Sequence, residues 1–377
     1  MDTNSSLGNR ITAILISLLI IIISVALVLM PKKAFSDNEN RELAPFPEFS
    51  ASAVKSGNYM EELNTYATDH FPMRDMWIGI ASQKDILLGK HKINGIYIAG
   101  NNYLIGEYEP LQNTDRIIQS FNKFKDSISD YEVNTYLMLV PTSFTINAKL
   151  LPNYITGGNQ LQDIKAVIKG TGLPYVDAGE LLAKHTDEYI FYRTDHHWTT
   201  LGAYYGYEAY CRATGLEATP LNEYKVVATV PDFYGTYASK VNAAFIKPDT
   251  ISLYAHPDDC PVVTYDDTGV VTDTLYNMDY AGRKDKYSIL LDNLHTLITI
   301  ENENATTDRV LLIVKDSYAN SIIPYLTHNY KTIYVVDTRY YRMGPSYLVK
   351  TYPDITDVLI LYNMSTIDSD TGIRGIF

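Results

Sequence analysis

Two short segments, far apart in the sequence, carry side chains that together could perform acyl transfer. The first is Thr194–Thr199, which contains Asp195 and His197. The second follows the apolar run 310–314 and contains Ser317. A serine hydroxyl becomes a nucleophile when an imidazole takes its proton, and a carboxylate orients that imidazole and stabilises its charged form. The two segments therefore supply a nucleophile, a base and an orienting acid, provided that the fold brings them together.

The segment around Ser317 has two interpretations. At a corner between a strand and a helix, a serine exposes its hydroxyl above the edge of the sheet. Its own N–H then lies among the unpaired amides of the helix N-terminus, which can stabilise a developing oxyanion. Serine is also a favoured N-cap residue, so Ser317 could simply cap the helix. The segment alone favours the capping role.

The segment around His197 has three interpretations. On an extended backbone, Asp195 and His197 lie on one side and His196 points away, which suits an acid–base pair. The residues could instead form an acidic cap with packed histidines, or a divalent-metal site of Asp195, His196 and His197. Because adjacent histidines diverge on an extended backbone, the metal site is the least favoured.

The elements that must position these residues alternate between apolar runs and helical patterns. Apolar spacing predicts helices around 117–128 and 161–168. Buried strands are predicted at 135–140, 175–176, 310–314, 332–336 and 358–361. Apolar strands separated by helices indicate a parallel sheet covered on both faces, and sites in such sheets form where strands end and helices begin. We therefore expect an α/β/α sandwich.

The domain organisation is predicted from changes in composition along the chain. Residues 1–10 form a short head, 11–30 a membrane anchor, and 31–90 a linker with helices around 51–68 and 73–89. Residues 91–377 form the α/β domain, which begins with a hairpin at 96–105. The stretch 220–300 contains short strands and the turn Asp266–Gly269, which suggests a β-rich insertion.

The apolar run 11–30 is long enough to cross a bilayer, because twenty helical residues span about 30 Å. No clear cleavage site follows it, so we expect an uncleaved anchor. Basic residues flank both ends, which leaves the orientation weakly determined. We expect the large domain to lie outside the cytoplasm, with residues 1–10 inside.

Composition excludes some partners and leaves others open. The 377 residues carry a net charge of −13 without a basic block, which argues against nucleic acid. The 32 tyrosines would suit a sugar polymer, although ordinary packing also accounts for them. Cys211 and Cys260 are too few for a disulfide framework, and a single bridge between them is an open alternative. Neither has a metal-ligand spacing, and we expect neither a cofactor nor a metal.

The Thr194–Thr199 segment resembles the signature of the DHHW family, which is similar to the alginate O-acetylation proteins and, more distantly, to the SGNH hydrolase superfamily. Further segments match this family in order along the chain. They are Asn38–Arg41, Leu43–Ala44, Phe46–Pro47, Asp69–Pro72 with Arg74, Ile105–Gly106, Phe233–Thr236 and Lys315–Ser317.

This resemblance implies a three-layer, flavodoxin-like SGNH fold with Ser317 as nucleophile, His197 as general base and Asp195 as its partner. Ordinary SGNH enzymes space the acid and base one residue further apart, at Trp198 in this chain. The assignment therefore follows the alginate-like subgroup.

Two departures from the superfamily concern the oxyanion site. The usual Gly-Asp-Ser block has Lys315 in place of glycine, which puts the geometry of the turn in doubt. No segment clearly matches the separate oxyanion glycine and asparagine. Arg339 and Asn363 are candidates for oxyanion or substrate binding, and a loop hydrogen bond is the alternative for each.

The resemblance implies a membrane-anchored, extracytoplasmic O-acetyltransferase or carbohydrate esterase of the bacterial cell envelope, acting on a cell-surface polysaccharide. A membrane-bound acyl-transfer partner is a further possibility. The alternative is a catalytically inactive scaffold that binds or helps to assemble a wall polymer.

Overall fold

The computed structural model describes residues 3–36, 41–155, 158–292 and 294–377. The chain divides into two compact units. One comprises Met1–Lys90 with Val241–Ala244, and the other comprises His91–Lys240 with Phe245–Phe377. The family-like residues 38–40 lie outside the described residues.

The first unit begins with the long helix α1 (Thr3–Leu29), in which Gly8–Leu29 is apolar and long enough to cross a membrane. This helix is a candidate membrane anchor or signal sequence. The helix expected over 51–68 is divided at Gly57, which ends α2. Gly57 has a φ of +89°, a backbone conformation that glycine adopts more easily than other residues. The other elements are β1 (Phe35–Ser36), β2 (Arg41–Glu42), α2 (Ala51–Ser56), α3 (Asn58–Asp69) and α4 (Arg74–Leu87).

Three of the family-like segments contact one another in this unit. Arg41 forms an ion pair with the buried carboxylate of Asp69 at 2.5 Å, and the Ala44 N–H donates to the same carboxylate at 2.9 Å. The hydrogen bond from Arg41 lowers the pKa of Asp69 to about 2, despite the opposing effect of burial. These residues hold the lead-in against α3, which is a structural role.

The second unit is built on a seven-stranded sheet with the order β10-β9-β11-β13-β12-β14-β6. The four strands β13, β12, β14 and β6 are parallel, and β11, β9 and β10 continue the sheet with antiparallel pairings. Their bounds are β6 (Asn134–Val140), β9 (Pro261–Tyr265), β10 (Val270–Thr272), β11 (Leu297–Asn302), β12 (Val310–Lys315), β13 (Thr332–Asp337) and β14 (Asp357–Asn363). Every residue of β12 and β14 is buried, which explains their continuous apolar sequences.

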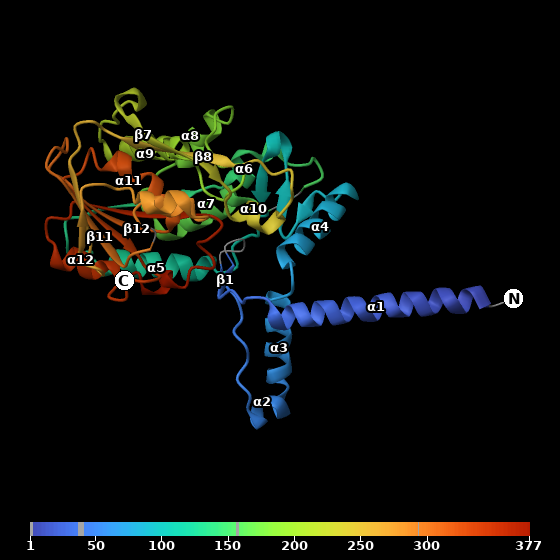
Figure 1. Cartoon of the computed structure of the whole chain (residues 1–377). Helices are drawn as coiled ribbons and strands as arrows, with labels where there is room; N and C mark the ends of the chain where they lie inside the picture. Colours follow the sequence, from blue (N-terminus) through green and yellow to red (C-terminus); the bar gives the residue numbers. More distant parts are fainter. Residues whose placement is uncertain (1–2, 37–40, 156–157, 293) are drawn as a thin grey trace. The chain divides into compact units, whose positions relative to one another are not determined.

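Helices cover both faces of this sheet. Figure 1 shows α5 and α12 on one side and α9 and α11 on the other. The strand order explains this arrangement of α11 and α12. The connection from β12 to β13 and the connection from β13 to β14 run in opposite directions across the sheet. Because both crossovers are right-handed, their helices lie on opposite faces. The helices of this unit include α5 (Thr114–Ser127), α6 (Ser143–Ile146), α7 (Gln160–Thr171), α8 (Ala178–Lys184), α9 (Thr200–Thr214), α10 (Thr236–Val241), α11 (Ile323–Leu326) and α12 (Pro345–Thr351).

The stretch 220–300 differs from the single β-rich insertion that the sequence suggested. Only β7 (Lys225–Phe233) and β8 (Asp249–Ala255) form a separate antiparallel sheet. The hairpin of β9 and β10 and the strand β11 instead extend the main sheet, because β11 buries Ile298 and Ile300 and pairs with β13. The sheet is therefore mixed rather than wholly parallel.

Smaller expectations also have clear outcomes. The hairpin at 96–105 is present as β4 (Ile96–Ile98) and β5 (Leu104–Gly106). The strand β3 (Lys92–Ile93) pairs with β4 and makes a three-stranded sheet. The strand expected at 175–176 is only an isolated bridge between Leu137 and Tyr175. Cys211 is buried and Cys260 is exposed, and both are free thiols, so the bridge between them is not formed.

Candidate active site

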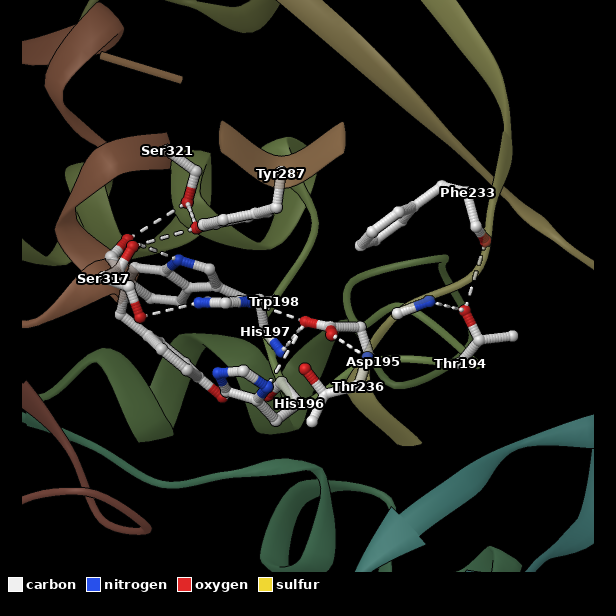
Figure 2. Close-up of polar contacts among 12 residues, drawn as sticks. Thr194, Asp195, His196, His197, Trp198, Phe233, Thr236, Tyr287, Ser317 and Ser321 are labelled. Carbon is white, nitrogen blue, oxygen red and sulfur yellow. Dashed lines mark hydrogen bonds and ion pairs between the residues drawn. The ribbon is translucent and has the colours of Figure 1, made fainter. Parts of the chain in front are cut away.

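The two chemistry-bearing segments converge at one edge of the sheet. Ser317 Oγ lies 2.8 Å from His197 Nε2, although the residues are 120 positions apart. His197 Nδ1 lies 2.5 Å from Asp195 Oδ1. Figure 2 shows the imidazole between the hydroxyl and the carboxylate. The three side chains thus form one hydrogen-bonded series, the arrangement that activates a serine.

Ser317 occupies the corner between β12 and a short 3₁₀ helix, Ser317–Ser321. The N-cap of that helix is Asp316, whose side chain accepts a hydrogen bond from the Tyr318 N–H at 2.9 Å. The capping role that the sequence favoured for Ser317 therefore belongs to Asp316. This leaves the Ser317 hydroxyl free to contact His197.

Asp316 is itself held by the loop after β14. Its Oδ2 accepts hydrogen bonds from the Asn363 N–H at 2.8 Å, from Asn363 Nδ2 at 2.7 Å and from the Thr366 hydroxyl at 2.7 Å. Burial raises the pKa of Asp316, which these hydrogen bonds oppose. They fix the direction of the corner at which the serine stands.

These contacts bear on the two residues named for oxyanion or substrate binding. Asn363 Nδ2 donates to Asp316 and, at 2.8 Å, to Thr366, so both its amide hydrogens are engaged within the protein. Arg339 binds the carboxylate of Asp337 through Nε at 2.8 Å and through a terminal nitrogen at 2.5 Å. Both contacts match the alternative of a loop hydrogen bond, and a substrate role for either residue stays a prediction.

Lysine at position 315 fits the turn without strain. Lys315 is the last residue of β12 and lies in register with Asp337 on one side and Leu361 on the other. Its extended backbone does not need glycine. The buried ammonium lies 4.0 Å from Asp337, and burial lowers the pKa of Lys315. The substitution therefore does not distort the corner that carries Ser317.

The loop before α9 positions the acid and the base. Asp195 Oδ1 accepts the His197 N–H at 3.0 Å, and Asp195 Oδ2 accepts the Thr236 N–H at 2.8 Å. Both Thr194 N–H and its hydroxyl donate to Asp249, at 2.8 and 2.6 Å. These contacts tie the loop to the β7–β8 sheet, which gives that sheet a role in holding the site.

Trp198 and Tyr287 connect the two segments directly. The fully buried Trp198 donates its indole N–H to the Tyr318 carbonyl at 3.0 Å. The Tyr287 ring stacks on the His197 ring with centroids 3.7 Å apart, and its hydroxyl donates to the Ser317 carbonyl at 3.0 Å. Sequence reasoning missed Tyr287, and in a chain with 32 tyrosines no local signal distinguishes it.

His196 does not point away, as the extended-backbone argument predicted. Its Nδ1 lies 3.5 Å from Asp195 Oδ1, and its ring centroid lies 3.8 Å from that of His197. The loop bends at these residues, so adjacent side chains converge. Possible ligand atoms of Asp195, His196 and His197 lie within 4.8 Å of one another. A metal there would nevertheless displace a bond, because both His197 nitrogens already have partners.

A hollow of about 530 Å³ opens beside His196. Its lining includes Thr236, Tyr237, Lys240 and Ser365. This size matches a small organic group or one to two sugar rings, within the range of ligand pockets. Of the residues next to Ser317 and His197 in the site, His196 lines this hollow.

The charges of the acid and base depend on one another. Burial alone would raise the pKa of Asp195, but His196 and His197 outweigh it and hold that pKa well below its usual range. Burial, reinforced by the neighbouring His196, lowers the pKa of His197 to about 4. The His197 imidazole is therefore neutral at physiological pH and can accept the proton of Ser317.

Activity that needs His197 as a base should therefore persist to low pH. We expect kcat/KM to rise with pH through about 4, because His197 must lose its proton to act as a base. The Asp195 carboxylate more than offsets the effect of burial and raises the pKa of His196, so His196 carries charge in this range. His196→Gln removes that charge and should move the acid limb upward by about one unit or more.

The measurement is a pH profile of kcat/KM for wild type, His196→Gln and His185→Gln. His185 is a surface histidine at the end of α8 and serves as the control, whose profile should match wild type. An acid limb that stays in place in His196→Gln would contradict the coupling.

Gly235 is required by its closeness to the acid. A Cβ at this position would lie 2.2 Å from Asp195 Cβ and 2.3 Å from Asp195 Oδ2, which forces the carboxylate to move. We expect Gly235→Ala to lower kcat by about 100-fold or more, the cost of a displacement near 1 Å in an active site. Gly282→Ala is the control, because a Cβ there meets nothing within 4 Å. Steady-state kinetics, with circular dichroism to check folding, measure the effect, and equal activity of the two variants would refute it.

Several solved structures resemble this chain. The chain resembles the crystal structure of a DHHW family protein from Eubacterium siraeum, with 26% identity and a TM-score of 0.66, covering 75% of this chain and 96% of that one. Bacillus cereus PatB1 with a sulfonyl adduct gives 19% identity and a TM-score of 0.61, covering 74% of this chain and 98% of that one.

The O-acetyltransferase domain of Pseudomonas putida AlgJ gives 14% identity and a TM-score of 0.46, covering 73% of this chain and 93% of that one. No curated protein matches the sequence. The sequence profile of the DHHW protein family matches residues 113–336, which include both segments of the site. Because this match covers more than half of the chain, the protein belongs to the DHHW family.

Proposed function

We propose that this protein is a serine-dependent acyltransferase or esterase that acts on O-acetyl groups of a cell-surface polysaccharide. One observation carries the proposal: Ser317, His197 and Asp195 form a continuous hydrogen-bonded series at the edge of the sheet. A serine that is merely structural needs neither a neutral imidazole at 2.8 Å nor a carboxylate behind it.

In the first half of the reaction, Ser317 Oγ attacks the acyl carbonyl carbon while His197 Nε2 takes the hydroxyl proton. Asp195 stabilises the imidazolium through Nδ1, and the Ser317 N–H stabilises the oxyanion. The imidazolium then gives its proton to the leaving oxygen as the C–O bond of the donor breaks. The product is an acyl-serine and a free alcohol.

In the second half, His197 takes a proton from the acceptor hydroxyl, which attacks the acyl-serine. Ser317 leaves and recovers its proton from His197. A sugar hydroxyl as acceptor gives transfer, and water gives hydrolysis. The hollow beside His196 would hold a sugar acceptor, and its lining includes polar groups such as Thr236, Lys240 and Ser365.

The proposed location rests on helix α1 as a candidate membrane anchor. A bilayer anchor at residues 11–30 would hold the second unit at the outer face of the membrane, within reach of surface polymers. A membrane-bound partner would then supply acyl groups. Fractionation of cells, with protease added to intact cells, tests this location: cleavage of the large domain without lysis is the expected result.

The competing function is an inactive scaffold that binds a wall polymer. A lysine in place of the usual glycine at position 315 would favour such a scaffold if it distorted the turn, but the regular position of Lys315 in β12 supports an intact corner. The test uses the full chain in detergent with a 4-nitrophenyl acetyl ester and a soluble oligosaccharide. We expect a burst of about one equivalent of 4-nitrophenol and an acetyl group on the peptide that contains Ser317.

Product analysis then separates the two reactions. Acetylated oligosaccharide identifies a transferase, and free acetate alone identifies an esterase. Absence of both the burst and the acetylated peptide, together with binding of the oligosaccharide, would establish the scaffold function instead.

A further inference from the structure

A second cluster of histidine and carboxylate side chains lies at the surface of the second unit, away from the catalytic residues. His256 follows β8, Asp259 lies in the turn that leads to β9, and His328 follows α11. One candidate ligand atom from each of the three residues lies within 4.8 Å of the others. Both histidines are buried, with exposed fractions of 7% and 8%, and Asp259 is partly exposed.

The cluster is rich in negative charge around two imidazoles. Asp259 Oδ1 lies 2.7 Å from His328 Nδ1. Glu223 lies 3.9 Å from His256 Nε2, and Asp258 lies 4.0 Å from His256 Nδ1. The two rings face each other with centroids 3.7 Å apart. Three carboxylates beside two imidazole rings make this a place that favours a divalent cation.

A buried asparagine holds the cluster in place. Asn302, at the end of β11, donates from Nδ2 to Asp259 Oδ1 at 3.0 Å and to the Thr327 carbonyl at 2.9 Å. Its Oδ1 accepts the Cys260 N–H at 3.1 Å. One side chain thus joins the turn that carries Asp259 to the segment that carries His328. Such outer contacts orient metal ligands in proteins.

We propose that His256, Asp259 and His328 bind a divalent transition metal, with zinc as the best match. Two imidazoles and one carboxylate are borderline ligands that suit Zn²⁺ and leave its fourth position for water. Tetrahedral zinc keeps neighbouring donors roughly 3.3 Å apart. His328 Nδ1 and Asp259 Oδ1 would therefore separate by a few tenths of an ångström from their present contact.

The proposed ion lies away from the catalytic residues. Asp249, at the start of β8, binds Thr194 next to the catalytic acid, whereas His256 follows the other end of the strand. The seven residues of β8, at about 3.3 Å each, place the two ends roughly 20 Å apart. The ion would join the β8–β9 turn to the segment after α11. Helix α11 itself follows the short helix that carries Ser317.

The test uses the full chain in detergent, treated with EDTA and then dialysed into chelator-free buffer. Zn²⁺ affinity is measured by competition with a chromophoric chelator, and Co²⁺ serves as a spectroscopic substitute. We expect one equivalent of Zn²⁺, a visible Co²⁺ spectrum of four-coordinate type and a higher Tm with Zn²⁺ than with EDTA.

The variants locate the site. His328→Ala and His256→Gln should lower Zn²⁺ affinity by more than about 100-fold, beyond the 10–100-fold that loss of an outer contact costs. His295→Gln is the matched control, because His295 also contacts two carboxylates, Asp267 and Asp292, but has no second histidine in its cluster. It should keep one equivalent. His197→Gln should also keep it, which separates this site from the catalytic cluster.

Three results would overturn the proposal: no stoichiometric Zn²⁺ binding by wild type, unchanged affinity in His328→Ala and His256→Gln, or binding that is lost in His197→Gln. If His328→Ala does not fold by circular dichroism, the milder His256→Gln decides the outcome, together with its Co²⁺ spectrum.

Discussion

Ser317→Ala is expected to reduce acetyl transfer or hydrolysis by about four to six orders of magnitude, as loss of the nucleophile does in other serine triads. The reason is geometric, because this hydroxyl is the group that His197 Nε2 contacts at 2.8 Å. Without it no acyl-serine forms, and only binding and the oxyanion donor remain. The rate with the acetyl ester is the measurement.

A serine-reactive sulfonyl fluoride gives an independent measurement. Mass spectrometry should find one sulfonyl group per chain in wild type, located on Ser317, and none in Ser317→Ala.

Ser321→Ala is the matched control for both measurements. Ser321 lies on the same short helix and hydrogen-bonds with the Tyr318 carbonyl, but it does not contact His197. It should retain labelling and most of the activity. Equal labelling of wild type and Ser317→Ala would show that another residue reacts, and no labelling of wild type would favour the scaffold function.

Asp195→Asn should lower kcat by about 10⁴-fold while the fold is kept, because an amide stabilises the wrong imidazole tautomer. Asp195 Oδ1 receives both the backbone N–H and the ring Nδ1 of His197, and Oδ2 receives the Thr236 N–H. An amide must place its NH₂ against at least one of these donors. The imidazolium also loses its counter-charge.

Steady-state kinetics with the acetyl ester measure this effect. Asp177→Asn is the control, because Asp177 is an N-cap residue of α8 and its asparagine variant keeps the capping ability. A loss below about tenfold in Asp195→Asn would mean that the carboxylate only positions the loop.

The metal alternative at the same loop makes a different prediction. If Asp195, His196 and His197 held a catalytic ion, EDTA would abolish activity and His196→Ala would be as damaging as His197→Ala. The serine mechanism predicts activity in EDTA and a far larger loss for His197→Ala, because only His197 contacts both Ser317 and Asp195.

Local sequence patterns predict some strands of the sheet and do not predict the pairing of others. Parallel strands that are buried over most of their length have continuous apolar sequences, so β6, β12, β13 and β14 are recognisable from local sequence. The strands β9 and β11 bury alternate residues, and short alternating runs do not reveal which sheet they join. Pairing with β13 is decided by long-range contacts, which is why the β-rich stretch was assigned to a separate insertion.

The site shows the same division at the level of single residues. Asp195, His197 and Ser317 could be named because their types and spacing are unusual, and because they resemble a family signature. Tyr287 could not, because its role comes only from stacking on His197 across the fold. The cap at the serine corner was assigned to the wrong residue, since serine and aspartate both cap helices and only the turn geometry selects Asp316.

Residue type and local periodicity were enough to predict the apolar N-terminal helix, the buried parallel strands and the candidate nucleophile, base and acid. Long-range packing brings the hydroxyl, imidazole and carboxylate together, turns His196 toward Asp195 and places two histidines beside Asp259. Side chains that are remote in the chain approach one another only when strands pair and helices pack. The free energy of this packing is distributed over many buried residues, so no single motif in the sequence predicts it.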